Sequence, residues 1–296
     1  MSVQLESLRR YVANRPPAFS PEVPERVLLV GSGKGGVGTS TVAALLAVMA
    51  AADGEEVLLL DADDNHGSLP LMFGAEPGRT LSSLRSGHAA PAELLVTLGH
   101  GLSLLPLGGT ADSGETFSAA ERRGLLRRVA SLYGRFDLVI VDAGSRLAQV
   151  MDAAASGAAR LIAVTAAERV SAAATYALVK TVDARFPGMP IDLLFNRCRL
   201  STATNGFEEI EAATTQFLQR AIGFAGALPD DDRLRTTVEE GMHLQDAAAL
   251  GTPATSACHE LAATLVRQFN ERDAARLRRA PDHSPAVAAP RISTRR

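Results

Sequence analysis

The chain has 296 residues, of which 46% are hydrophobic and 21% charged, and its formal net charge is −3. This composition is typical of a soluble globular protein with ample material for a core, and it argues against a disordered or fibrous chain. The two cysteines, Cys198 and Cys258, form no Cys-x-x-Cys pair, which favours a reducing compartment and argues against a zinc or iron–sulfur site. No apolar run is long enough to span a bilayer, so we expect a cytoplasmic protein.

The N-terminal residues predict an appendage ahead of the folded domain. Residues 1–13 space Leu5, Leu8 and Val12 along one face of a short amphipathic helix. Residues 14–25 contain four prolines, which favours an extended linker.

From residue 26 onward, short apolar runs alternate with helical segments. Continuous apolar runs suit the strands of a parallel sheet that helices cover on both faces. The predicted strands are 27–30, 57–61, 102–107, 137–142, 161–165, 191–196 and 223–228. The sequence therefore predicts a single α/β domain over residues 26–278, with a mostly parallel central sheet, a last helix near 255–278 and a disordered basic tail over 279–296.

A glycine-rich loop, GSGKGGVGTST at 31–41, lies between a predicted strand and a predicted helix. This context favours a phosphate cradle, in which backbone N–H groups and the helix dipole face the phosphates and the Ser40 hydroxyl ligates Mg²⁺. The lysine expected just before that hydroxyl is missing, because Thr39 stands there. The predicted nucleotide-binding residues are Gly33, Lys34, Gly35, Gly36, Val37, Gly38, Thr39, Ser40 and Thr41. The alternative is a glycine-rich turn that binds nothing.

Carboxylates follow two of the predicted strands. Asp61 and Asp63 come at the end of the run LLLDAD, and Asp142 ends FDLVIVD, a Walker B pattern. The carboxyl ends of parallel strands line the crevice in which α/β proteins bind ligands. The sequence therefore predicts a magnesium-dependent nucleotide site at this edge of the sheet.

The segment GKGGVGTS resembles the deviant Walker A motif of the MinD/ParA family of P-loop ATPases. The resemblance implies ATP or ADP with Mg²⁺, a homodimer that forms with ATP, and slow hydrolysis. It implies that Lys34 contacts the phosphates bound to the partner protomer and that Asp63 positions the attacking water, so both are catalytic. It also implies that Ser40, Asp61 and Asp142 hold the metal, and it makes Asp142 a catalytic residue as well. Thr39 replaces the family lysine that contacts the β- and γ-phosphates. The lost charged hydrogen bond is worth about 1.5–3 kcal/mol of nucleotide binding. We expect the catalytic rate to be affected more than nucleotide binding.

Two further sites follow from the resemblance. Relatives have glycine where this chain has Arg146, and we hypothesise that Arg146 brings a positive charge back toward the phosphate; the alternative is an arginine that faces solvent. Family members use an asparagine at a strand end and a later loop to hold adenine. The matching residues here are Asn196, Arg197, Pro229 and Asp230.

Within the family, the likeness is to the branch of the flagellar number regulator FlhG (FleN). In VQLESLR, three positions (Gln4, Leu8 and Arg9) match a helix that stimulates the signal-recognition-type GTPase FlhF. The implied partners are a second copy of the chain, FlhF through residues 1–13, and flagellar basal-body or transcription-regulator proteins. An ordinary amphipathic helix is the alternative at this terminus.

The basic C-terminus bears on membrane and nucleic-acid contact. Residues 271–296 hold seven arginines and three acids, which predicts at most weak electrostatic contact with the inner membrane face or a cell pole. The domain shows no obvious basic surface, so nucleic acid is not an expected partner. Two other functions remain open: a nucleotide-binding scaffold without hydrolysis, and a positioning role in cellulose secretion or at a polar organelle, as in the relative BcsQ.

Overall fold

The computed structural model describes residues 26–63, 68–75, 81–107, 118–239 and 244–279. The predicted helix at 1–13, the linker at 14–25 and the tail beyond residue 279 lie outside the described residues.

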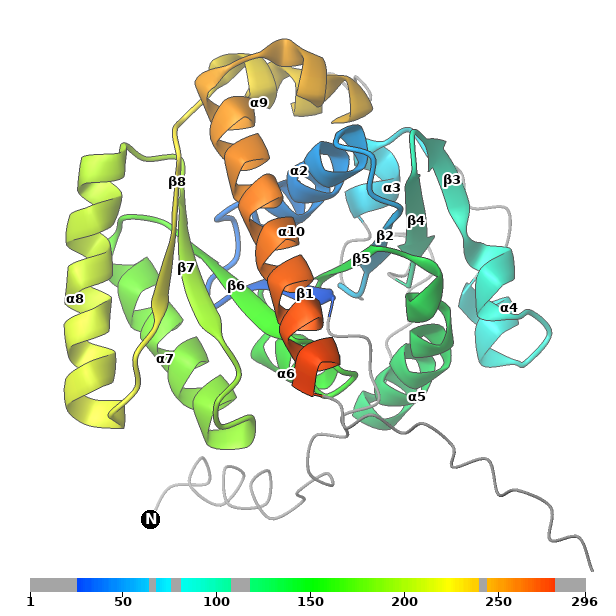
Figure 1. Ribbon diagram of the computed structural model, residues 1–296, viewed down its shortest axis with the longest axis horizontal. Helices are drawn as coiled ribbons and strands as arrows, with labels where there is room; N and C mark the ends of the chain where they lie inside the picture. The colour runs from blue at the N-terminus through cyan, green and yellow to red at the C-terminus, as the bar shows by residue number, and fades with distance from the viewer. Residues whose placement is uncertain (1–25, 64–67, 76–80, 108–117, 240–243, 280–296) are drawn as a thin grey trace, which may run out of the picture.

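An eight-stranded sheet forms the centre of the molecule (Figure 1). Its strands are β1 (Val27–Ser32), β2 (Val57–Asp61), β3 (Val96–Gly99), β4 (Leu102–Pro106), β5 (Leu138–Asp142), β6 (Arg160–Thr165), β7 (Ile191–Asn196) and β8 (Gly223–Leu228). Their order is β3-β4-β2-β5-β1-β6-β7-β8, and every neighbouring pair is parallel except β3 with β4. All seven predicted strands are present, so the mostly parallel α/β fold is confirmed.

The strand β3 is the one that the sequence did not predict. It pairs antiparallel with β4 through a tight turn at His100 and Gly101, whose φ angles of 51° and 77° suit a hairpin turn with two left-handed residues. The residues of β3 are partly or largely exposed, so the strand lacks the continuous apolar run that marks the buried strands.

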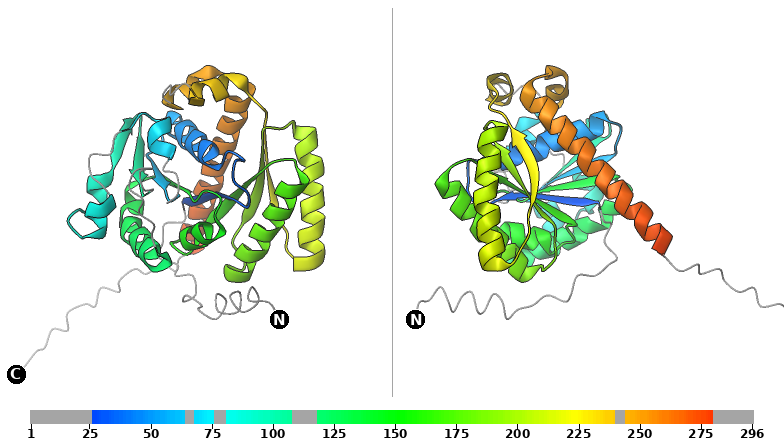
Figure 2. Two further views of the ribbon diagram at one scale, coloured as in Figure 1. Left: turned by 180° about the vertical axis from the view of Figure 1, so that it is seen from behind. Right: turned by 60° about the vertical axis from the view of Figure 1, so that its left-hand side comes forward.

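Helices cover both faces of the sheet (Figure 2). On one face lie α2 (Thr39–Ala52), α3 (Ser68–Met72), η3 (Leu244–Leu250) and α10 (Pro253–Arg279), with α9 (Asp232–Glu239) beside them. On the other face lie α4 (Leu81–Arg85), η1 (Pro91–Leu94), α5 (Ala119–Val129), η2 (Ala130–Arg135), α6 (Leu147–Ala154), α7 (Arg169–Arg185) and α8 (Leu200–Leu218). The predicted last helix is thus present as α10. Among the described helices, none has the length and apolar character that crossing a membrane requires.

The strand order places a crevice at the carboxyl end of β1. Every residue of β1, β2 and β5 is buried, because helices cover both faces of these strands. From β1, the sheet extends through β5 on one side and through β6 on the other. Ligands of open α/β sheets bind where the strand order turns in this way.

Candidate functional site

The loop between β1 and α2 has a backbone shape that requires glycine. Gly36 and Gly38 have φ angles of 80° and 88°, in the left-handed region that other residues rarely adopt. Gly33 needs the absence of a side chain for another reason, because a Cβ there would collide with the backbone carbonyl of Ala174 in α7. The glycine loop is therefore held closely against its neighbours.

The first turn of α2 leaves its backbone N–H groups open. Gly38 is the N-cap residue, and the described residues provide neither a side-chain cap bond there nor an acidic group in the first turn. Unsatisfied N–H groups and the helix dipole make such a helix start favourable for an anion. The predicted binding residues of the loop, 33–41, all surround this helix start.

Thr39, which stands in place of the expected lysine, is turned into the protein. The residue is only 7% exposed, and its Oγ1 donates a hydrogen bond to Ser32 Oγ at 2.8 Å. The Ser32 hydroxyl donates in turn to the carbonyl oxygen of Lys34 at 3.1 Å. The buried Thr39 side chain therefore connects the two ends of the glycine loop through hydrogen bonds.

Lys34 reaches away from the loop to α7. Its Nζ lies 2.7 Å from Oε2 of Glu168, the N-cap residue of that helix. The hydrogen bond and the charge of Lys34 lower the pKa of Glu168. Both side chains are exposed, at 37% and 62%, so solvent screens this ion pair.

Two carboxylates, Asp61 and Asp142, stand side by side at the carboxyl ends of β2 and β5. They are partners in the register of these parallel strands, and both are buried. Among the described residues, Oδ2 of each has no hydrogen-bond partner. Burial, followed by the charge of Asp142, raises the pKa of Asp61 well above its ordinary value. Burial also raises the pKa of Asp142 to about 6, although hydrogen bonds from Ser40 and the Gly144 N–H act to lower it.

A divalent cation fits this pair of carboxylates. Two neighbouring buried charges repel one another, and a hard cation with oxygen ligands removes that cost. The Ser40 hydroxyl acts to lower the pKa of Asp142 and therefore lies near the same carboxyl group. The predicted metal set of Ser40, Asp61 and Asp142 is thus brought together and fits Mg²⁺, which when bound would neutralise charge on a phosphate.

Asp63 lies against the loop that follows β5. Its backbone N–H donates to Asp61 Oδ1 at 3.2 Å. Gly144 has a φ of 61°, and a Cβ added to it would collide with the Asp63 carboxylate. A Cβ on Gly35 would lie 3.4 Å from Ser145 Oγ, so the loop after β5 also touches the glycine loop. The three predicted segments of the site are therefore in mutual contact.

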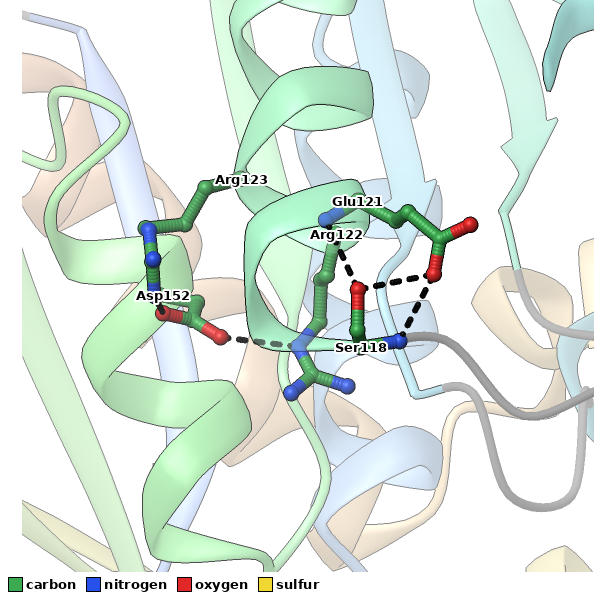
Figure 3. Close-up of polar contacts among 5 residues, drawn as sticks. All are labelled: Ser118, Glu121, Arg122, Arg123 and Asp152. Carbon is green, nitrogen blue, oxygen red and sulfur yellow. Dashed lines mark hydrogen bonds and ion pairs between the residues drawn. The ribbon is translucent and has the colours of Figure 1, made fainter.

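The helix after this loop is anchored away from the site by two ion pairs to a buried aspartate (Figure 3). Asp152 of α6 accepts hydrogen bonds from Arg122 Nε at 2.9 Å and from Arg123 Nη1 at 3.1 Å, both in α5. The Asp152 side chain is only 5% exposed. At the other end of α6, Arg146 is the N-cap residue and is exposed, and its role toward phosphate stays a prediction.

The residues predicted to hold the base gather at the carboxyl ends of β7 and β8. Asn196 Nδ2 donates to the Val37 carbonyl oxygen at 2.8 Å, and its Oδ1 accepts from the Arg197 N–H at 3.0 Å. Beside them is a pocket of about 130 Å³, whose lining also includes Pro229 and Asp230. Thr41, predicted as part of the phosphate loop, also lines it, and the lining residues that were not predicted are Val42, Leu45, Leu228, Asp231, Leu234, Arg235 and Ala254.

Apart from the pocket lining, three residues that contact the predicted site were not predicted from the sequence: Ser32, Gly144 and Glu168. Ser32 sits inside the quoted glycine string, so its hydroxyl was visible as a candidate. Gly144 follows the Asp142 motif within two residues. Glu168 had no local signal, because it is 134 residues from Lys34 along the chain.

The ParA family model, described as NUBPL iron-transfer P-loop NTPase, matches residues 24–266 of this chain. The chain belongs to the ParA family. The expected MinD/ParA resemblance is thereby confirmed, and nucleotide binding is general among P-loop ATPases of this family.

Two curated relatives carry flagellar names. The ParA-family chain is 26% identical to the antiactivator FleN of Pseudomonas aeruginosa over 218 residues, which are 73% of this chain and 78% of FleN. It is also 26% identical to the flagellum site-determining protein YlxH of Helicobacter pylori over 173 residues, which are 57% of this chain and 58% of YlxH.

Solved structures of MinD share the fold. The MinC:MinD complex of Aquifex aeolicus matches with a TM-score of 0.66 at 21% identity, covering 82% of this chain and 96% of that chain. MinD of Pyrococcus horikoshii OT3, complexed with Mg-ADP, matches with a TM-score of 0.63 at 24% identity, covering 80% and 94%. At these identities the likeness shows the fold alone.

Proposed function

We propose that the protein is an ATP-controlled switch that dimerises with nucleotide, hydrolyses ATP slowly and regulates the number or placement of flagella. The observation that carries the proposal is the similarity to FleN over 73% of the chain. The name of YlxH, a flagellum site-determining protein, points to the same task.

The geometry of the site supports nucleotide binding. The open N–H groups at the start of α2 would hold the phosphates, and the pocket at Asn196 would hold the base. Ser40, Asp61 and Asp142 would hold Mg²⁺, in line with a MinD neighbour that is complexed with Mg-ADP. Asp63, at the mouth of the site, would orient the attacking water.

Lys34 is the residue that would act on a second copy of the chain. Its ion pair with Glu168 is exposed at both ends, and exposed pairs contribute little to stability. Exchange of Glu168 for a phosphate of the partner protomer therefore has a small cost. The proposal also includes three kinds of contact. Residues 1–13 would contact FlhF, and the protein would also contact flagellar basal-body or transcription-regulator proteins and the inner membrane face or cell pole.

The burial of Thr39 favours a second candidate, a nucleotide-binding scaffold that does not hydrolyse ATP. Threonine carries no charge, and its hydroxyl already donates to Ser32, so position 39 supplies neither a positive charge nor that hydrogen bond to the γ-phosphate. Turnover measured on the protein that binds ATP separates the two candidates.

The dimer is tested by molar mass from light scattering in Mg-ATP and in Mg-ADP. The wild type is expected to double its mass in Mg-ATP, and Lys34→Ala is expected to stay monomeric. Lys180→Ala is the matched control, because Lys180 is the other lysine of the chain and is exposed on α7. An unchanged mass of the wild type in Mg-ATP contradicts the switch, and a normal flagellar count in cells that lack the gene contradicts the flagellar task.

A further inference from the structure

A chain of hydroxyl groups joins the two ends of the glycine loop. Thr39 is the first residue of α2, and its hydroxyl donates to Ser32 Oγ at the end of β1, at 2.8 Å. The Ser32 hydroxyl donates to the Lys34 carbonyl at 3.1 Å. Ser32 is fully buried, and Thr39 nearly so. We call these three groups the Thr39–Ser32 bridge.

The bridge is also connected to the loop after β5. The Ser32 backbone N–H donates to the Gly144 carbonyl at 3.0 Å, and the Gly144 N–H donates to Asp142 Oδ1 at 3.0 Å. One buried serine therefore links the glycine loop to the strand end that carries a predicted metal ligand.

A loop of this composition needs such support. Four of the six residues in 33–38 are glycines, and glycine loses more conformational freedom on ordering than any other residue. If the loop became ordered only when the ligand arrived, that entropy would be subtracted from the binding free energy. A bridge that orders the loop beforehand removes this loss.

We propose that Thr39 is a positioning residue, which through Ser32 holds the phosphate loop in its binding shape before nucleotide arrives. The proposal rests on nucleotide binding as the function of the site. It gives position 39 a different role from that of a lysine, because a buried hydroxyl shapes the backbone without contributing charge. A charged side chain in the same buried place would need a compensating partner.

This role predicts a distinct pattern of ligand effects. A residue that shapes the loop should change the affinities for ATP and ADP by the same factor, because the cradle is common to both. A residue that contacts the γ-phosphate should change the affinity for ATP more than the affinity for ADP. Because the bridge carries no charge, its removal should leave the salt dependence of the nucleotide affinity unchanged.

The test compares Thr39→Val, which keeps the shape and loses the hydroxyl, with Thr39→Ser and Ser32→Ala. Thr214→Val is the matched control, because Thr214 is buried in α8 and its hydroxyl bonds to the Glu211 carbonyl within the helix. Affinities for Mg-ATP and Mg-ADP come from titration calorimetry. Amide hydrogen exchange of residues 33–38 is measured without nucleotide.

We expect Thr39→Val and Ser32→Ala to weaken both nucleotides about tenfold and to speed exchange in the loop. Thr39→Ser should restore what Thr39→Val loses, and Thr214→Val should change neither quantity. Unchanged loop exchange in Thr39→Val, or a loss confined to ATP, overturns the proposal. If the wild type binds no nucleotide, the proposed function fails, and the exchange data still decide whether the bridge orders the loop.

Discussion

The starts of α2 and α5 meet the same structural requirement in opposite ways. At α5, the Ser118 hydroxyl accepts a hydrogen bond from the Glu121 N–H at 3.3 Å, and the Glu121 carboxylate accepts one from the Ser118 N–H at 3.0 Å (Figure 3). At α2, Gly38 offers no side-chain acceptor. Every helix begins with unsatisfied N–H groups. At α5 side chains satisfy them, whereas α2 begins without a side-chain cap, as α6, α7 and α8 also do, and α2 is the start at which we place the phosphates.

The largest effect is expected from a side chain at the open helix start. In Gly38→Ala, the added Cβ would collide with the Asn196 amide, and the φ of 88° would be strained. Together these should weaken nucleotide binding by about a hundredfold in calorimetry. In Gly124→Ala, within α5, the new Cβ meets nothing within 4 Å, so stability should rise by about 1 kcal/mol with unchanged affinity. Equal affinities in the two variants would contradict the comparison.

The buried carboxylates Asp61 and Asp142 make the candidate nucleotide site a source of pH-dependent instability. Because burial raises the pKa of Asp142 from 3.8 to about 6, the folded state favours the protonated acid. Stability should therefore fall as pH rises from about 4 to 6, by about 3 kcal/mol, and stay low above pH 6. Urea unfolding without metal should show that Asp142→Asn reduces this loss, and that Mg²⁺ stabilises the wild type more at pH 8 than at pH 5. A wild type whose stability does not change between pH 4 and 8 would argue against the buried pair.

The closed helix start should affect stability alone. Ser118→Ala removes the cap of α5 and should cost about 1 kcal/mol, which lowers Tm by about 2–4 °C. Calorimetric affinity for Mg-ATP should stay at the wild-type value. A matching loss of affinity would mean that the two helix starts are coupled, through the α5–α6 ion pair at Asp152.

The smallest change in stability is expected at the exposed ion pair of the loop. In Glu168→Gln, Tm should stay within a degree of the wild type, because solvent screens the pair with Lys34. Turnover should reach half of its maximum at a lower protein concentration, because Lys34 is released for the second copy. If turnover keeps its concentration dependence, the pair does not restrain Lys34.

The sequence predicted what depends on local pattern and missed what depends on distant contacts. Buried strands appear as apolar runs, and the glycine loop and the acids at strand ends stand in contiguous motifs. The half-exposed β3 has no such run. The pairing of Lys34 with Glu168, across 134 residues, leaves no trace in either neighbourhood. Position 39 was recognised as a lost lysine, but only the structure shows its hydroxyl engaged with Ser32.

The measurement that tests the central claim most directly is a calorimetric titration of the wild type with Mg-ATP and Mg-ADP, with turnover followed on the same preparation. The open start of α2 and the paired carboxylates predict that both nucleotides bind with micromolar affinity, and that ATP is hydrolysed slowly. Binding of both without turnover would identify the scaffold. Failure of either nucleotide to bind would contradict the account.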